Sequence, residues 1–138
     1  MSFKRFRVLL VEDDPDLCEI IKDKLAIMGF EYIRTAHDGD DGMKALQSAI
    51  GNAKFDLVIA DWKMPKLSGM DLLRYMRSHA FYSKTPFVML TGVDDEQHVK
   101  EALAVGVSDY LVKPFDQKLF HSKITRVMRQ ISDYSATD

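Results

Sequence analysis

A chain of 138 residues has the length of about one domain, and 46% hydrophobic with 29% charged residues is an ordinary globular composition. The balance of 19 Lys and Arg against 21 Asp and Glu gives a net charge of -2, which offers no general attraction to nucleic acid or to an anionic membrane. Cys18 is the single cysteine, and neither a secretory signal nor a long apolar run is present. An internal disulfide is therefore excluded, and a cytoplasmic location is expected.

Strand-like and helix-like runs alternate from the start of the chain. The run at 6–11 is rich in Val and Leu, and Pro15 then marks the start of a helix with apolar residues at helical spacing. Gly29 ends that helix. A second strand at 32–36 and a second helix after Asp38 repeat the unit.

Three further units follow. The run at 55–60 is an almost wholly apolar strand, and Ser68 with Asp71 resembles a capping box at the start of a helix. The remaining predicted elements are strands at 86–90 and 110–112, a helix capped by Asp94 with Gln97, and a last helix that begins at Asp116 and carries an apolar face of Phe120, Ile124, Val127, Met128 and Ile131. Because apolar strands need cover on both faces, the alternation predicts an α/β, doubly wound sandwich with a parallel sheet.

The cysteine and the histidines carry no functional hypothesis. Cys18 lies beside the apolar stripe of the first predicted helix, which favours a half-buried structural thiol over a nucleophile. The histidines show no metal-ligand spacing, and a surface role is expected for each of them: His37, His79, His98 and His121.

Polar residues occupy the ends of the predicted strands, where open parallel sheets bind their ligands. Asp14 alone is interpreted as a helix cap, Asp61 alone as a turn residue, and Lys113 alone as a surface lysine. Carboxylates crowded at one crevice repel each other, however, and a hard cation such as Mg2+ relieves that repulsion. The residues at these strand ends are Glu12, Asp13 and Asp14, then Asp61, Thr91, and Lys113 with Pro114.

Four segments in this order resemble the receiver domains of response regulators in two-component signalling. They are VLLVEDDP at 8–15, LVIADWKMPKLSG at 57–69, FVMLTG at 87–92 and GVSDYLVKPF at 106–115. The pair Asp61-Trp62 is especially similar to the single-domain, CheY-like chemotaxis receivers. The resemblance implies a flavodoxin-like (βα)5 fold with strand order 2-1-3-4-5, and we expect a receiver domain at 1–131 followed by a polar tail at 132–138.

The resemblance also implies a phosphorylation site. Asp61 would accept a phosphoryl group from the phosphohistidine of a sensor histidine kinase or a histidine phosphotransfer protein, forming an acyl phosphate. Asp13, Asp61 and the backbone carbonyl of Lys63 would hold Mg2+, and Glu12 would hold a metal-bound water. Lys113 would bind a phosphoryl oxygen, aimed by a cis bond to the following proline.

A conformational switch is implied by the same likeness. Thr91 would bind the phosphoryl group together with Lys113, and Tyr110 would turn inward, changing the face formed by the fourth helix, fifth strand and fifth helix. The chain would then be no enzyme in the ordinary sense, because it would catalyse only its own phosphorylation and dephosphorylation. A downstream protein, an output domain or a second copy forming a homodimer would recognise the changed face, with no direct nucleic-acid or membrane contact.

Two features depart from the simplest form of this family. Lys63 and Val93 lie two residues after Asp61 and Thr91, at variable positions that tune the lifetime of the acyl phosphate. The acidic run 94–96 stands where a motor-binding chemotaxis receiver is more often basic, which argues against a flagellar-motor role.

The sequence leaves three alternatives to a single receiver domain. A haloacid-dehalogenase-like phosphatase needs a second acid two residues after Asp61, where Lys63 stands. A flavodoxin-like binding module needs a first loop that cradles phosphate, and the carboxylates at 12–14 would repel one. The chain is also consistent with a piece of a longer regulator or hybrid kinase.

Overall fold

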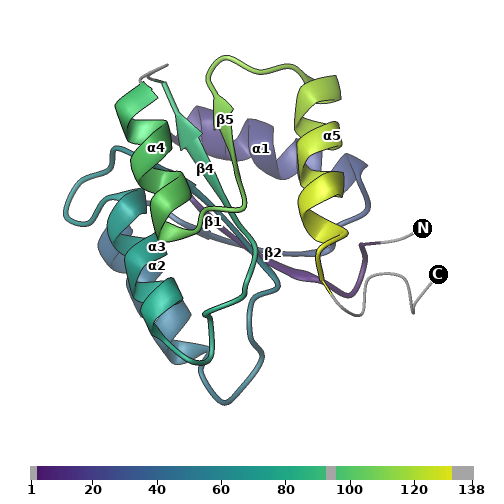
Figure 1. Cartoon of the computed structure of the whole chain (residues 1–138). Coiled ribbons are helices and arrows are strands. Elements are labelled where there is room, and N and C mark those ends of the chain that lie inside the picture. Colours follow the sequence, from purple (N-terminus) through teal and green to yellow (C-terminus); the bar gives the residue numbers. More distant parts are fainter. Residues whose placement is uncertain (1–2, 93–95, 132–138) are drawn as a thin grey trace.

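The computed structural model describes residues 3–92 and 96–131, in which strands and helices alternate as predicted (Figure 1). Within these residues no helix is both long and apolar enough to span a membrane. The elements are β1 Arg7–Val11, α1 Pro15–Ile27, β2 Tyr32–Ala36, α2 Gly39–Ser48, β3 Leu57–Asp61, α3 Gly69–Ser78, β4 Phe87–Thr91, α4 Glu96–Val105, β5 Asp109–Val112 and α5 Gln117–Met128.

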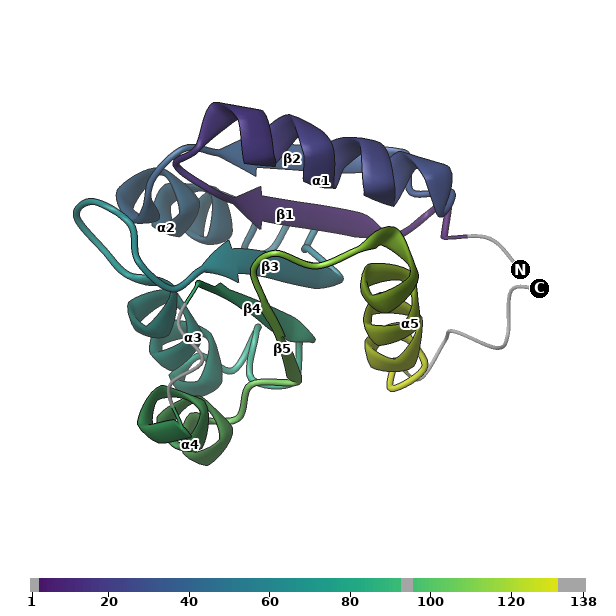
Figure 2. The same cartoon turned by 90° about the horizontal axis from the view of Figure 1, so that it is seen from above.

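The strands form one parallel sheet in the order β2-β1-β3-β4-β5, which confirms the predicted topology. The first strand, β1, lies beside the edge strand β2, and the chain passes from β1 outward to β2 and then crosses back past β1 to β3. The strand order therefore reverses between β1 and β3, and sheets of this kind bind ligands outside the carboxyl ends of the strands at such a point. Helices α1 and α5 cover one face of the sheet, and α2, α3 and α4 cover the other (Figure 2).

Side chains of one strand alternate between two hydrophobic cores. In β1, Val8 and Leu10 pack toward α1 and α5, whereas Leu9 and Val11 pack toward α2 and α3. The central strands β3 and β4 are buried at every position, which explains why their sequences are apolar almost throughout. Cys18 is fully buried in the first core, deeper than the half-buried position expected for it.

Helix starts follow the predicted caps. Oδ1 of Asp14 accepts hydrogen bonds from two backbone N–H groups of the first turn of α1, and Ser68 with Asp71 forms the predicted capping box of α3. Asp38 and Asp116 cap α2 and α5. The predicted cap at Asp94 lies outside the described residues, as does the tail at 132–138, so both remain predictions.

Candidate functional site

Three carboxylates meet at the carboxyl ends of β1 and β3. Glu12 and Asp13 follow β1, and Asp61 is the last residue of β3. One oxygen from each side chain lies within 4.8 Å of the other two. Glu12 and Asp61 are buried while Asp13 is exposed, so the cluster is open to solvent on one side. The structure thus brings together the acidic residues that the sequence placed at the strand ends.

Lys113 reaches into this cluster from the end of β5. Its ammonium nitrogen lies 2.8 Å from Oδ2 of Asp61 and 3.2 Å from Oε1 of Glu12. The peptide bond from Lys113 to Pro114 is cis, as the family resemblance implied. Because burying a charge is costly unless it is paired, these contacts compensate the burial of both carboxylates.

The electrostatics of the cluster leave an excess of negative charge. Burial raises the pKa of Glu12 to about 7, and the charge of Asp61 adds to this, while the N–H of Asp14 and the ammonium of Lys113 oppose it. Burial lowers the pKa of Lys113, but its hydrogen bond to Asp61 and the two nearby carboxylates outweigh this, so the pKa is raised overall. One ammonium faces three carboxylates. This all-oxygen donor set fits a hard divalent cation such as Mg2+.

Backbone contacts hold the strand ends in fixed positions. The N–H of Trp62 donates to Leu90 O at 2.8 Å, and the N–H of Lys113 donates to Thr91 O at 2.7 Å. The chain after β3 returns close to its own strand, so that a Cβ added to Gly69 would lie 2.3 Å from the carbonyl oxygen of Asp61. A glycine is therefore required where α3 begins.

A cavity of about 250 Å3 opens beside Asp61. We call it the phosphoryl cavity. Glu12 and Asp13 are not among its lining residues, so Asp61 is the member of the acidic cluster that faces it. The residues that line it are Asp61, Trp62, Lys63, Thr91, Gly92, His98 and Lys113.

One residue of this lining, His98, was not expected there from the sequence. His98 was expected to be a surface histidine, but its ring packs against Trp62 with centroids 4.7 Å apart and planes inclined by 32°. Spacing along the chain gives no direct signal for this contact, since it depends on how α4 is rotated against the sheet. Tyr110 does not line the phosphoryl cavity; the ammonium of Lys123 lies 4.6 Å from its ring centroid.

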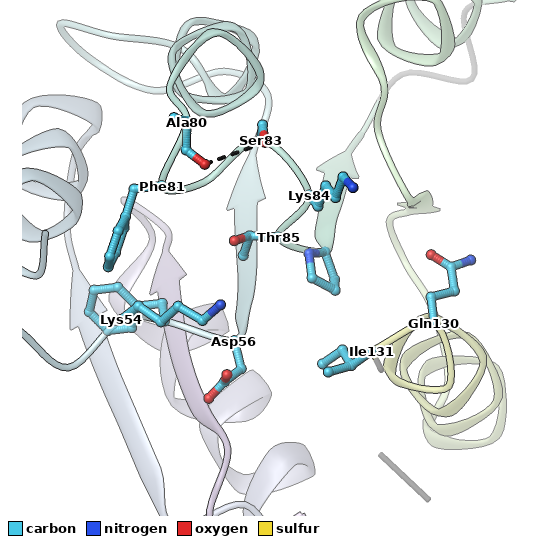
Figure 3. Close-up of a pocket in the computed structure, with 11 residues that line it drawn as sticks. Lys54, Asp56, Ala80, Phe81, Ser83, Lys84, Thr85, Gln130 and Ile131 are labelled. Atoms are coloured by element: carbon cyan, nitrogen blue, oxygen red, sulfur yellow. Dashed lines mark hydrogen bonds between the residues drawn. The ribbon is translucent and has the colours of Figure 1, made fainter. Parts of the chain in front are cut away.

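A second cavity, of about 490 Å3, lies near the amino-terminal ends of β3 and β4, at the opposite edge of the sheet (Figure 3). Asp56 is the one carboxylate among the residues that line it, and Lys54 and Lys84 are its cationic side chains. Gln130 and Ile131 border it from beyond the end of α5. Without clustered carboxylates, this cavity offers no counterpart to the chemistry at Asp61.

The sequence model of the family described as response regulator receiver domain matches residues 8–125. The chain belongs to this family of receiver domains. Two curated relatives of the receiver are chemotaxis proteins: CheY of Pseudomonas aeruginosa is 33% identical over 126 residues, 91% of this chain and 98% of that protein. CheY1 of Helicobacter pylori is 32% identical over 122 residues, 88% and 96% of the respective chains.

A solved structure supports the same assignment. The chemotaxis response regulator CheY4 of Vibrio cholerae superposes on this receiver with a TM-score of 0.79 at 30% identity, covering 88% of this chain and 98% of that one. Receiver domains of two-component systems accept phosphoryl groups, bind Mg2+ at an acidic pocket, and act with histidine kinases and downstream targets. The alternatives of a haloacid-dehalogenase-like phosphatase and of a flavodoxin-like binding module are therefore wrong, whereas the predicted flavodoxin-like fold is confirmed.

Proposed function

We propose that this receiver accepts a phosphoryl group on the carboxylate of Asp61, in a Mg2+-dependent reaction with the phosphohistidine of a sensor histidine kinase or a histidine phosphotransfer protein. The observation that carries this assignment is the position of Asp61. It belongs to the acidic cluster, accepts a hydrogen bond from Lys113, and faces the phosphoryl cavity. Glu12 and Asp13 do not combine these features.

In this transfer the phosphoryl group would pass from a histidine nitrogen of the partner protein to Asp61. A carboxylate oxygen of Asp61 forms a bond to phosphorus while the bond from phosphorus to the histidine nitrogen breaks, and the imidazole leaves with the electron pair. Lys113, already 2.8 Å from Asp61, would turn its ammonium to a phosphoryl oxygen. The hydroxyl of Thr91 would donate to another, and such charge-assisted hydrogen bonds strengthen as charge develops.

The acidic cluster is proposed to hold the metal. Asp13, Asp61 and the backbone carbonyl of Lys63 would be its protein ligands, and the carboxylate of Glu12 would hold a metal-bound water. Bound Mg2+ would neutralise charge on the phosphoryl oxygens. The excess of carboxylates over the single ammonium of Lys113 supports this assignment.

The proposed output is a change in the face formed by α4, β5 and α5. Thr91 would move toward the phosphoryl group, and Tyr110 would turn into the space that it leaves. Both residues line a small recess beneath α4, which supports their coupling. The receiver would thus be a switch that catalyses only its own phosphorylation and dephosphorylation, recognised by a downstream protein, an output domain or a second copy.

Intact-mass analysis after incubation with acetyl phosphate and Mg2+ tests the assignment. The wild type should gain one base-labile phosphoryl group, Asp61→Asn should gain none, and Asp13→Asn should lose the dependence on Mg2+. Asp23→Asn, which changes an exposed aspartate of α1, is the matched control and should behave as the wild type. Full phosphorylation of Asp61→Asn would refute the proposed site.

A further inference from the structure

Two adjacent cavities share part of their walls. The smaller one, of about 10 Å3, lies beneath α4, and we call it the switch recess. Trp62, Thr91 and His98 line both the phosphoryl cavity and the switch recess. The other residues that line the recess are Met89, Val99, Ala102 and Tyr110.

The three shared residues differ in how firmly they are held. The backbone of Trp62 is tied to two elements, because its N–H donates to Leu90 O at 2.8 Å and its carbonyl accepts from the N–H of Gly69 at 2.9 Å. Thr91 ends the central strand β4. His98 lies on α4, and its ring contacts the ring of Trp62.

Helix α4 is packed more shallowly than its neighbour α3. Among the described side chains of α4, at 97–105, Ala102 alone is buried, whereas α3 buries residues along its whole length. The ion pair between Arg74 and Glu101 joins the two helices at 2.7 Å, but both side chains are substantially exposed and such pairs contribute little. The contact of His98 with Trp62 is one of the contacts that hold α4 against the strand ends.

The size of the switch recess shows why this contact matters. Its volume of about 10 Å3 is close to the least that holds one water molecule, and it is far too small for a tyrosine ring. An inward turn of Tyr110 requires the wall of the recess to move. Thr91 forms this wall on the strand side, and His98 forms it on the α4 side next to the phosphoryl cavity.

We propose that His98 is a second switch position, whose ring packs against that of Trp62, holds α4 over the recess and opposes the inward turn of Tyr110. This inference rests on the proposed function, because it assumes that phosphorylation at Asp61 draws Thr91 away. His98 is a positioning residue here and does not react. Removing its ring enlarges the recess and releases α4, which raises the population of the active conformation before any phosphoryl group is bound.

Linkage makes this population measurable. A ligand that binds only the active conformation binds more tightly in proportion to the fraction already active. Beryllofluoride, which mimics the phosphoryl group on aspartate, is such a ligand. Loss of an aromatic pair typically corresponds to an increase of about two- to tenfold in that fraction.

The experiment titrates beryllofluoride into the Mg2+-loaded receiver, with the backbone amide of Tyr110 observed by NMR. His98→Ala should bind about two- to tenfold more tightly than the wild type, with an unchanged affinity for Mg2+ alone. His98→Phe, which keeps a ring against Trp62, should remain within about twofold of the wild type. Leu103→Ala, at an exposed position of the same helix, is the matched control and should have no effect.

Two results for His98→Ala would overturn the inference. Equal beryllofluoride affinity in His98→Ala and the wild type would overturn the inference. A change in Mg2+ affinity as large as the change in beryllofluoride affinity would also overturn it, because His98 would then be only a fixed wall of the cavity. His98→Gln is a second ringless variant and is expected to match His98→Ala. A wild type that fails to bind beryllofluoride would overturn the proposed function itself, and this inference with it.

Discussion

The ammonium of Lys113 lies 2.8 Å from Oδ2 of Asp61, across the carboxyl ends of β5 and β3. This contact pairs the proposed phosphoacceptor with the one lysine that lines the phosphoryl cavity from β5. The same ammonium lies 3.2 Å from Glu12, so it also compensates the most buried carboxylate of the cluster.

Replacing Lys113 by Met should separate phosphoryl transfer from metal binding. Phosphorylation by acetyl phosphate should fall about 10- to 100-fold, the range expected for one lost hydrogen bond to a charged group. Binding of Mg2+ should persist, because the ammonium repels a cation. Intact-mass time courses and a Mg2+ titration measure the two effects. Lys84→Met, in the cavity at the opposite edge of the sheet, should change neither.

Trp62 should report the metal directly, because it is the only tryptophan and adjoins Asp61. We expect Mg2+ to change its fluorescence saturably, with a dissociation constant on the order of 1 mM. Asp13→Asn should weaken or abolish the change. An emission spectrum that is insensitive to Mg2+ in the wild type would count against a preformed metal site.

Thr91→Ala should uncouple the site from the output face. Phosphorylation at Asp61 should continue, whereas the amide shifts of Tyr110 and α5 that accompany beryllofluoride binding should be largely lost. Converting the ratio of active to inactive conformations from about 1:99 to 99:1 requires about 5.5 kcal/mol. Losing one charge-assisted hydrogen bond at Thr91 therefore removes a substantial part of this free energy. Thr85→Ala is the control, since Thr85 is a comparably buried threonine just before β4. A full response at Tyr110 in Thr91→Ala would contradict the proposed route.

The raised pKa of Glu12 predicts a pH-dependent stability without divalent metal. Between its ordinary value of 4.5 and about 7, the carboxyl is protonated in the folded chain but ionised in the unfolded one. Because the folded state then binds more protons, the free energy of unfolding should fall by about 1–3 kcal/mol as pH rises through this window. Urea unfolding at about pH 5 and about pH 7.5 measures the change. The decline should be absent in Glu12→Gln and present in Glu19→Gln, which alters an exposed residue.

Tyr82 should contribute to stability through its hydroxyl. The side chain is fully buried, and the hydroxyl donates to the carbonyl of Leu46 at 2.6 Å, which joins the loop after α3 to α2. Burial raises the pKa of Tyr82 to about 12, so this hydrogen bond persists across the neutral range. Tyr82→Phe should cost about 1–2 kcal/mol in chemical unfolding. Tyr32→Phe, at an exposed tyrosine, should cost less than about 0.5 kcal/mol.

Many of the helices and strands were predictable from short sequence patterns. The apolar run that became β3 requires cover on both faces, and the caps at Asp14 and Ser68 act within one helical turn, so each was predictable from nearby residues. The boundaries of the third strand differ: the predicted apolar run covers 55–60, whereas β3 runs Leu57–Asp61 and has Asp61 as its last residue. Asp61 pairs with Leu90 of β4, and that pairing is set by the neighbouring strand.

The alternation of strands and helices and the polar residues at the strand ends were predictable from the sequence, because both follow from periodicity along a short stretch of chain. The atoms that are in contact at the site, and their distances, depend on the folded arrangement of several elements. Lys113 contacts Asp61 and Glu12 across 52 and 101 positions of the sequence, and no local pattern encodes such distances. The contact of His98 with Trp62 depends likewise on the rotation of α4 against the sheet. That rotation is set by the sum of packing contacts from several elements, and a helical spacing on α4 alone does not specify it.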